Sequence, residues 1–323
     1  MLDLIIKNGW VVNATHSQQM DIAVKDGKIV AMGQASLFPE AEKTVDAAGL
    51  WVLPGMIDTH VHMNKRFGAS PSQDNYYNGS IAAAYGGTTA IVDFGFPYGD
   101  ETPAQAMERK LEEIKGQSVI DYSFHSNLTK ANEENYGQIR ELIQQGFPSV
   151  KMFTIFNYGR MLEKAGIYEV LRIIAKENGL SMVHTESADL IDRYIADTVA
   201  KGHTLPIDLA KTRPPITELE ALYALIAMVE DTGAPTIVAH LTASGAAPAI
   251  AKAKQTMPLF IECCTHYLTL DESVYRRPDA CRYTCVPPMR DLENQAKLWE
   301  MVNHGLIDLI NSDHTDFSSE QKD

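Results

Sequence analysis

Two histidines separated by one residue, His60 and His62, form the strongest chemical signal in this sequence of 323 residues. They follow the segment LPGMIDT at the end of a predicted strand. Because side chains alternate along a strand, residues two apart project to the same face, and both imidazoles can reach one metal ion. The pair alone is equally compatible with a structural or surface role.

Four further polar residues lie at the carboxyl ends of other predicted strands: Lys151, His184, His240 and Asp313. The active sites of (β/α)₈ barrels are assembled from these strand ends, and chance placement on five separate strands explains the pattern poorly. Imidazole nitrogens and carboxylate oxygens suit zinc and its first-row neighbours, whereas calcium and magnesium prefer oxygen ligands. We therefore predict a metal site, with zinc as the default ion and manganese, iron or cobalt as alternatives.

Lys151 is the unusual member of this set, because an ammonium group between two metal ions would be repelled. A lysine buried next to cations has a lowered pKa, and its free amine can react with carbon dioxide to give a carbamate that could bridge two ions. The alternative is a lysine that extends from a strand end toward water. The surrounding histidines favour the carbamate.

The elements that must position these residues begin at about residue 51, where short apolar runs alternate with helix-like segments such as 102–116 and 218–233. Alternating strands and helices indicate a parallel sheet with crossovers, which is an α/β fold. Eight strands are the number that closes a (β/α)₈ barrel. The eight candidates are 50–62, 88–94, 119–128, 149–156, 180–187, 235–244, 258–268 and 306–315.

The first fifty residues have a different pattern, with strand-like segments at 2–13, 20–33 and 43–55. Their alternation and the pairs Asn8-Gly9 and Asp26-Gly27 predict hairpins. We therefore place a small β domain at 1–51 and the barrel at 52–323. The chain ends nine residues after His314, before an eighth helix could form, so we expect that a C-terminal part is missing.

Composition and charge exclude several classes of protein. The chain is 45% apolar and 22% charged, as in ordinary soluble domains, and its net charge of −14 argues against a nucleic-acid surface. It has neither a signal-peptide pattern nor an 18-residue apolar span, which predicts a cytoplasmic protein without a membrane partner. The four cysteines are expected to be reduced; a zinc pair of Cys281 and Cys285 lacks a second pair of ligands.

In sum, the motifs resemble the amidohydrolase superfamily and, within it, the dihydropyrimidinase and hydantoinase group. The resemblance spans nearly the whole chain and implies a barrel with a small β-sandwich domain, of which 1–51 would be the N-terminal part. It also implies a small cyclic amide as substrate and a homo-oligomer, tetrameric by analogy. The motifs that carry it are PGMIDTHVHM, GGTTAIVDF, SVKMF, MVHTES, TRPPITELEA, VAHLTASGA, ECCTHYLTLD, CVPPMR and SDHTDFSSEQK.

The resemblance further implies a role for each candidate residue in a site with two divalent ions. His60 and His62 would bind the more buried ion, His184 and His240 the other, and carboxylated Lys151 would bridge them. Asp313 would contact a metal and transfer the proton. These roles predict a hydrolase that opens a hydantoin, dihydropyrimidine or related ureide or imide by attack of a metal-bridging hydroxide, with Asp313 as general base and acid.

Two positions depart from the pattern of this group and concern substrate binding. Relatives usually carry a tyrosine that stabilises the oxyanion five residues after the lysine, where this chain has Phe156; Tyr158, two residues on, is a candidate replacement. Relatives often have a serine before the paired prolines, where this chain has Val286. We therefore expect a more apolar substrate pocket.

Two other functions remain open from the sequence. An allantoinase-like or dihydroorotase-like hydrolase is the nearest enzymatic alternative, because Arg66 lies four residues beyond His62, where dihydroorotases use an arginine to bind a carboxylate. A non-catalytic scaffold related to dihydropyrimidinases would be expected to bind no metal. Of the remaining histidines, we expect His125, His266 and His314 to be hydrogen-bonded structural groups and His16, His203 and His304 to lie on the surface or in loops.

Overall fold

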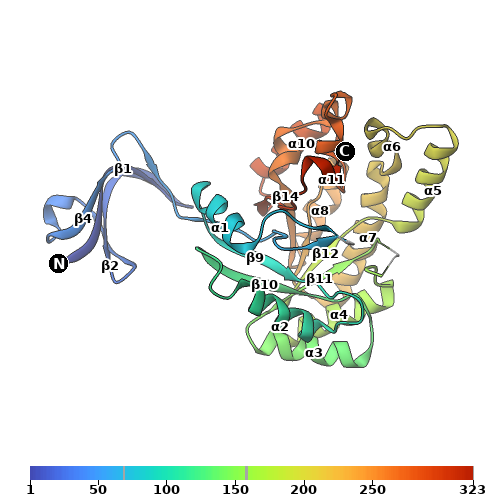
Figure 1. Ribbon diagram of the computed structural model, residues 1–323, viewed down its shortest axis with the longest axis horizontal. Helices are drawn as coiled ribbons and strands as arrows, with labels where there is room; N and C mark the ends of the chain where they lie inside the picture. Colours follow the sequence, from blue (N-terminus) through green and yellow to red (C-terminus); the bar gives the residue numbers. More distant parts are fainter. Residues whose placement is uncertain (68–69, 157–158, 323) are drawn as a thin grey trace. The chain divides into compact units, whose positions relative to one another are not determined.

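A computed structural model describes residues 1–67, 70–156 and 159–322 of the chain. These residues form two compact units, Met1–Met56 and Ile57–Asp323, which are drawn in Figure 1. The division between the units therefore falls at 56/57, whereas the sequence suggested 51/52.

The first unit is a five-stranded sheet in which β2 and β3 form the hairpin predicted at Asp26-Gly27. Both turn residues have positive φ, 51° and 69°, as a tight hairpin turn requires. The strand order is β3-β2-β1-β4, and β5 also pairs with β1. Leu2, Ile5 and Ala23 form the core of this unit. The elements are β1 (Leu2–Val12), β2 (Ser17–Lys25), β3 (Lys28–Gly33), η1 (Ala35–Leu37), β4 (Ala41–Asp46) and β5 (Trp51–Val52).

The hairpin predicted at Asn8-Gly9 is wrong. These two residues lie inside β1, where the register with β2 shifts between Ile6 and Gly9 and Asn8 has φ 62°. The pair forms a β-bulge, because pairing with β2 continues on both sides of it. A side chain at position 9 would also meet Val52 Cγ2 at 2.5 Å, so only glycine fits there.

The second unit contains the predicted barrel of eight parallel strands, in the order β15-β14-β13-β12-β11-β10-β9-β6. Seven of the strands fall within the segments predicted from the sequence, and the eighth, β9, ends one residue beyond its predicted segment 88–94. The strands are β6 (Met56–Asp58), β9 (Thr88–Gly95), β10 (Asp121–Asn127), β11 (Ser149–Phe153), β12 (Leu180–His184), β13 (Thr236–Val238), β14 (Leu259–Cys264) and β15 (Leu309–Asn311).

The chain segments that follow the first and last barrel strands close the barrel. Val61 and His314 form a parallel bridge, and the backbone N–H of His62 donates to the carbonyl of His314 at 2.7 Å. The side chain of Asn311 bonds to Thr59 twice, accepting from its backbone nitrogen at 3.0 Å and donating to its hydroxyl at 2.8 Å. This closure brings His60 and His62 beside residues more than 250 positions away in the sequence.

Helices surround the barrel, and their termini follow ordinary capping rules. Thr102 and Gln105 form a capping box at the start of α2, and α7 ends at Gly233 in the left-handed conformation. Figure 1 shows α2, α3 and α4 side by side outside β10 and β11. The α-helices are α1 (Tyr76–Tyr85), α2 (Pro103–Ile114), α3 (Glu133–Gln144), α4 (Lys164–Glu177), α5 (Ala188–Ala200), α6 (Leu209–Thr212), α7 (Pro215–Thr232), α8 (Ala247–Ala253), α9 (Thr265–Thr269), α10 (Leu292–Asn303) and α11 (Ser319–Lys322).

Shorter elements lie in the connections. The strands β7 (Arg66–Phe67) and β8 (Ser70–Pro71) form an antiparallel pair in the connection after β6. The 3₁₀ helices are η2 (Pro206–Asp208), η3 (Ser244–Ala246), η4 (Glu272–Arg276) and η5 (Ala280–Tyr283). Within the described part of the chain, no helix is both long enough and apolar enough to cross a membrane.

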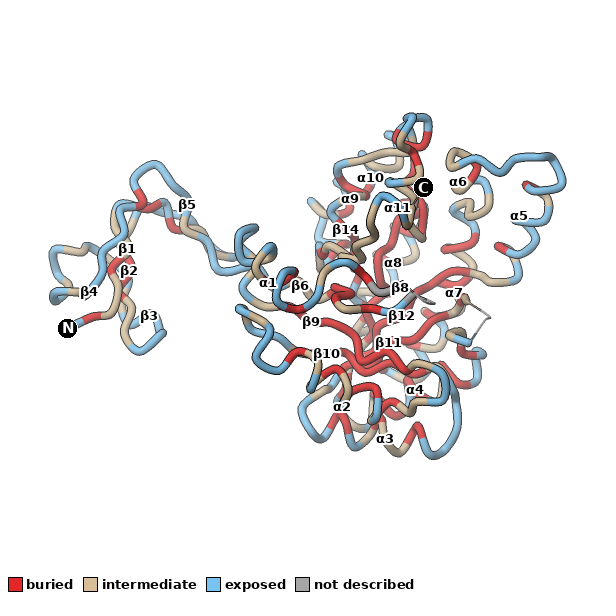
Figure 2. The backbone as a smooth tube through the Cα atoms, in the orientation of Figure 1, coloured by how far each residue is buried: buried red, intermediate tan, exposed pale blue. Residues whose placement is uncertain are grey.

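Strand alternation explains how a lysine comes to face the inside of the barrel. All five residues of β11 are buried, as expected for a parallel strand covered on both faces (Figure 2). Val150 and Met152 pack into the large apolar core that includes residues of α3 and α4. Lys151, between them, must therefore point to the opposite, inner face.

Candidate active site

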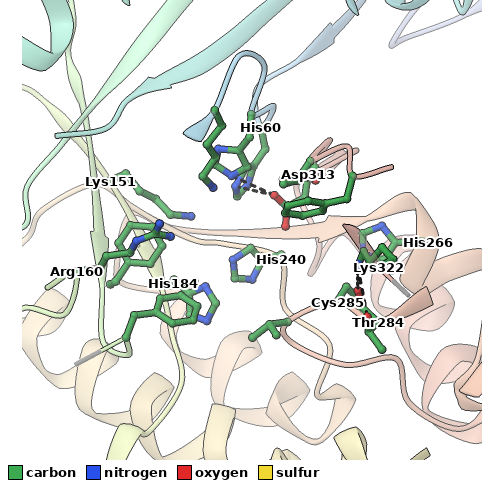
Figure 3. A pocket seen from close by; sticks show the side chains of 17 residues that line it. His60, Lys151, Arg160, His184, His240, His266, Thr284, Cys285, Asp313 and Lys322 are labelled. Atoms are coloured by element: carbon green, nitrogen blue, oxygen red, sulfur yellow. Dashed lines mark hydrogen bonds and ion pairs between the residues drawn. The ribbon is translucent and has the colours of Figure 1, made fainter. Parts of the chain in front are cut away.

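All six predicted metal-binding residues line one cavity of about 510 Å³ at the carboxyl ends of the barrel strands (Figure 3). Lys151 is inside β11, and His184 is the last residue of β12. The others lie just beyond their strands: His60 and His62 after β6, His240 after β13, and Asp313 after β15. The barrel thus gathers side chains from five strand ends, as the sequence predicted.

His60, His62 and Asp313 form one group of converging ligand atoms. The Nε2 atoms of His60 and His62 each lie 3.3 Å from Asp313 Oδ1. The three ligand atoms are within 4.8 Å of one another, and both histidines are buried. Two imidazole nitrogens and a carboxylate oxygen at this separation are suited to a divalent transition-metal ion.

His184 and His240 form a second group beside the first. Their ring centroids are 4.4 Å apart, and the His240 ring is 5.5 Å from that of His60. The Nδ1 atom of His240 is buried and has no hydrogen-bond partner within the described residues. A buried nitrogen without a partner is costly, so this atom is suited to a bound group.

Lys151 extends its amine toward the space that these histidines surround (Figure 3). The side chain is 1% exposed, and its Nζ atom lacks a hydrogen-bond partner among the residues that the structure describes. Burial lowers the pKa of Lys151 to about 8, although the carboxylates of Glu262 and Asp313 act in the opposite direction. Far more of the amine is therefore uncharged near neutral pH than in an ordinary lysine, and the uncharged form can act as a nucleophile.

Glu262, in β14, connects His60, His240 and Asn311 through its carboxylate. Its Oε1 atom lies 2.8 Å from His60 Nδ1 and accepts from the backbone nitrogen of His240 at 2.9 Å, while Oε2 accepts from Asn311 at 3.1 Å. Burial acts to raise the pKa of Glu262, but the attraction of His60 outweighs it and the pKa is lowered. The carboxylate fixes the proton of His60 on Nδ1 and leaves Nε2 directed at the cavity.

Glu186 has the same role for His184. Its Oε2 atom lies 2.7 Å from His184 Nε2 and 2.7 Å from the guanidinium of Arg213. This contact leaves Nδ1 of His184 as the nitrogen available to a ligand. Neither Glu262 nor Glu186 was predicted from the sequence, although an acid inside the apolar run LFIECC was a usable signal.

The protonation states suit metal binding. Burial lowers the pKa of His184 and lowers those of His62 and His240 well below the usual histidine value, so these rings are neutral. Burial acts to raise the pKa of Asp313, but His60 and His62 outweigh it and the pKa lies well below its usual range. Neutral imidazoles and an ionised carboxylate are the forms that bind metal ions.

Three residues that line the cavity have left-handed backbone conformations. The φ angles are 37° at His240, 49° at Asp313 and 69° at Phe156, which non-glycine residues rarely adopt. Such conformations persist where the surroundings enforce them, and they are frequent at functional sites.

A buried network fixes the loop after His240. The carboxylate of Glu218 accepts from the backbone nitrogen of Thr242 at 2.8 Å and from the guanidinium of Arg290 at 2.5 Å. The same guanidinium donates to the Thr242 hydroxyl at 3.0 Å.

The substrate side of the cavity is only partly as predicted. Phe156 and Val286 line it, while Tyr158 lies outside the described residues. The expectation that these two residues make the substrate pocket more apolar stays a prediction; Lys65, Arg160 and Lys322 line the same cavity. Arg66, which the sequence singled out, is exposed and is not among the lining residues. The cationic residue that lines the cavity in this segment is Lys65, the preceding residue in the sequence.

Lys65 is 8% exposed, and its pKa is lowered to about 7 by burial and by repulsion from Arg160. The sequence carries no periodic pattern that marks these loop positions.

His266 also differs from its predicted structural role. It lines the cavity, and its Nε2 atom is buried without a partner in the described ranges. His125 behaves as expected, with Nδ1 2.6 Å from the Ser149 hydroxyl and Nε2 2.9 Å from the Thr59 carbonyl. His314 contacts Asp74 at 3.0 Å, and the remaining histidines, His16, His203 and His304, are exposed. The four cysteines are free thiols.

Comparisons with known proteins agree with this geometry. Residues 51–319 match the model of the amidohydrolase family. The D-hydantoinase of Geobacillus stearothermophilus is 34% identical over 318 residues, which are 97% of this chain and 67% of the relative.

Two solved structures are closely similar to the chain. The D-hydantoinase of a Bacillus sp. AR9 superposes with a TM-score of 0.93 at 32% identity, over 98% of this chain and 70% of its own. The dihydropyrimidinase of Brevibacillus agri NCHU1002 gives 0.93 at 33% identity, over 98% and 69%. The fold, the strand-end residues and the family match lead to one conclusion: the chain belongs to the amidohydrolase family.

Proposed function

We propose that this protein is a hydrolase that opens a cyclic amide, such as a hydantoin, a dihydropyrimidine or a related ureide or imide. The observation that carries the proposal is the convergence of His60, His62, Lys151, His184, His240 and Asp313 on one cavity. The relatives named D-hydantoinase and dihydropyrimidinase support the same reaction class.

The side chains fit a pair of divalent ions, with zinc as the expected metal. His60 and His62 would hold one ion and His184 and His240 the other, because each pair offers imidazole nitrogens that face the cavity. The buried Lys151 Nζ and His240 Nδ1 atoms, which lack partners within the described chain, support the presence of an additional bound group. When bound, such ions lower the pKa of a water molecule and polarise an amide carbonyl.

We propose that Lys151 carries a carbamate. Its uncharged amine attacks the carbon of carbon dioxide, a nitrogen–carbon bond forms, and a proton is released to solvent. The product is an anion at a position where an ammonium group would repel metal ions. Its two oxygens would be available as ligands to the two ions. The lowered pKa of Lys151 supports this step, because it makes the nucleophilic amine available near neutral pH.

Asp313 is the proposed general base and acid. Its carboxylate is ionised, faces the cavity and lies 3.3 Å from the Nε2 atoms of His60 and His62. From there it can accept a proton from the attacking water and donate it to the ring nitrogen as the carbon–nitrogen bond breaks. Phe156 supplies no hydroxyl for the developing oxyanion, so donors other than a side chain at this position must stabilise it.

We also propose that the Met1–Met56 sheet is part of a β-sandwich and that the chain forms a homotetramer. Leu37, Leu50 and Trp51 of this sheet unit are exposed, which supports a packing partner for it. Light scattering coupled to size-exclusion chromatography would give the mass, and a monomer at micromolar concentration would contradict the tetramer.

A dihydroorotase-like activity through Arg66 receives no support, because Arg66 is exposed and does not line the cavity. A scaffold without catalysis would not need six potential ligands at one site. Metal content distinguishes these cases directly.

The test is to purify the protein in bicarbonate-containing buffer, measure metal per chain by mass spectrometry, and assay the same sample against cyclic ureides and imides. We expect two metal ions per chain and ring opening. Lys151→Ala should lose metal and activity, whereas Lys115→Ala, whose side chain is 73% exposed, should keep both. A folded wild-type protein that binds no metal from such buffer would refute the proposal and favour the scaffold.

A further inference from the structure

Two largely buried arginines, Arg213 and Arg290, support the cavity without lining it. Their side chains are 12% and 7% exposed. A buried charge is costly unless it is paired and hydrogen-bonded, so the partners of these two guanidinium groups indicate what the arginines do. The partners belong to the segments that carry His184 and His240, the two histidines proposed to bind the second ion.

Arg213 is connected to His184 through one oxygen of Glu186. The Arg213 Nη1 atom donates to Glu186 Oε2 at 2.7 Å, and the same oxygen lies 2.7 Å from His184 Nε2. The Glu186 side chain is 0% exposed, so the charge of Arg213 compensates a carboxylate that has no access to water. The carboxylate in turn holds the His184 ring with Nδ1 available to a ligand.

The backbone of this segment is held by a different residue. The Thr154 hydroxyl lies 2.8 Å from the carbonyl oxygen of His184 and 2.7 Å from that of Glu186, and it accepts from the Glu186 backbone nitrogen at 2.9 Å. These contacts do not involve Arg213. Replacing Arg213 should therefore disturb the Glu186 carboxylate and the His184 ring while the strand end keeps its place.

Arg290 extends the network to the loop after His240. Its Nη1 atom donates to the carbonyl oxygen of Arg213 at 2.5 Å, and its Nε atom donates to the Thr242 hydroxyl at 3.0 Å. Glu218 accepts from Arg290 at 2.5 Å and from the Thr242 backbone nitrogen at 2.8 Å. One buried network therefore supports both histidines proposed for the second ion.

The histidines proposed for the first ion have other supports. His60 Nδ1 lies 2.8 Å from Glu262, and the backbone nitrogen of His62 donates to the carbonyl of His314 at 2.7 Å. Within the described part of the chain, neither arginine forms a hydrogen bond with His60 or His62. Loss of the Arg213 side chain should thus affect one pair of metal-binding histidines and spare the other.

We propose that Arg213 is a positioning residue that sets the affinity for the ion held by His184 and His240. This inference rests on the proposed function, because it requires two bound ions, and it assigns a separate control to one of them. Groups that orient metal-binding histidines usually contribute about 10–100-fold to metal affinity. We expect an effect of this size on one of the two dissociation constants.

The experiment measures zinc per chain in the metal-loaded protein after dialysis against chelator buffers that fix the free zinc concentration. Arg213→Met, which removes the charge and the hydrogen bonds, should release one ion at a free zinc concentration about 10–100-fold higher than the wild type does. The other ion should be released within about twofold of the wild-type value. Arg193→Met removes an arginine whose side chain is 75% exposed and should match the wild type.

Two further variants test whether Arg213 acts through His184. Arg213→Lys keeps the positive charge and should recover part of the lost affinity; it carries the test if circular dichroism shows that Arg213→Met is unfolded. His184→Ala removes the ring that Glu186 orients. Adding Arg213→Met to His184→Ala should therefore change the affinity for the remaining ion by less than about twofold, whereas a general loss of stability would weaken it further.

Three results would overturn the inference: equal weakening of both ions, release of both ions as in the wild type, or a further loss of zinc in the double variant. In each case the wild type still binds two ions, and the proposed function stands. A folded wild-type protein that binds no zinc would refute the proposed function and this inference together.

Discussion

Replacing Glu262 by glutamine should weaken metal binding without changing the shape of the site. The buried carboxylate lies 2.8 Å from His60 Nδ1 and accepts from the His240 backbone nitrogen at 2.9 Å. Glutamine has the same size, and its one oxygen can still accept from both of these donors, which contact the same Oε1 atom; the acceptor that is lost is Oε2, which accepts from Asn311 at 3.1 Å. It cannot keep the negative charge that polarises His60, and its amide group places a donor where a second acceptor stood.

The size of the effect follows from the contacts that are lost. Carboxylates that orient metal-binding histidines usually contribute about 10–100-fold to metal affinity. This range corresponds to about 1.4–2.7 kcal/mol. Because the remaining oxygen keeps part of the hydrogen bonding, we expect Glu262→Gln near the lower end and Glu262→Ala, which removes the acceptor of His60, the His240 nitrogen and Asn311, near or above the upper end.

The assay is competition for zinc against a chelator of known affinity, followed by metal analysis of the protein and by activity at saturating zinc. Activity of Glu262→Gln should recover in part when the zinc concentration is raised. The variant binds zinc more weakly, but it keeps all the residues that are proposed to take part in the reaction. Glu112→Gln makes the same charge change at a side chain that is 69% exposed and serves as the matched control. Zinc affinity of Glu262→Gln within twofold of the wild type would refute this account of how His60 is held.

Three further predictions test other parts of the molecule. Zinc-dependent reactivation of metal-stripped protein at constant dissolved carbon dioxide should become faster as the pH rises through about 8, because Lys151 reacts only when deprotonated; a rate that is flat from pH 6.5 to 9 would contradict the carbamate. Phe156→Tyr should raise kcat on unsubstituted hydantoin by about tenfold or more by adding an oxyanion donor, and an unchanged kcat would show that the hydroxyl is not needed. Asp93→Ala should lower the free energy of unfolding by about 3–5 kcal/mol in urea titrations, because the buried amine of Lys110 loses its carboxylate partner. Adding Lys110→Met should restore much of this loss. Equal stability of the single and double variants would argue against charge burial as the cause.

The sequence predicted the barrel and its strand-end residues because both depend on local patterns. Strands such as β11 and β12 are short apolar runs, and Lys151 and His184 stand out in them as polar residues on an otherwise apolar strand. The number of strands then gave the topology, and the topology placed those residues together. This reasoning needs no knowledge of distant contacts, which is why it succeeded.

The residues that were missed depend on contacts between distant parts of the chain. Glu262 acts on His60, which is 202 residues away, and no spacing rule connects them. Lys65 and Arg160 lie in loops, where neither the strand period nor the helix period marks a side chain that faces the cavity. Asn8-Gly9 shows the opposite failure: its local preference for a turn was overridden by the pairing of β1 with β2 on both sides.

The predicted and the missed residues of the cavity differ in where they lie in the fold. The residues proposed to carry out the reaction lie on barrel strands or within four residues of their ends, where the closed sheet fixes them. Lys65, Phe156 and Arg160, which also line the cavity, lie in connecting segments, which can change without disturbing the strands. The reaction class can therefore be argued from the residues at the strand ends, whereas the choice of substrate has to be measured on variants of the loop residues, as with turnover of unsubstituted hydantoin by Phe156→Tyr.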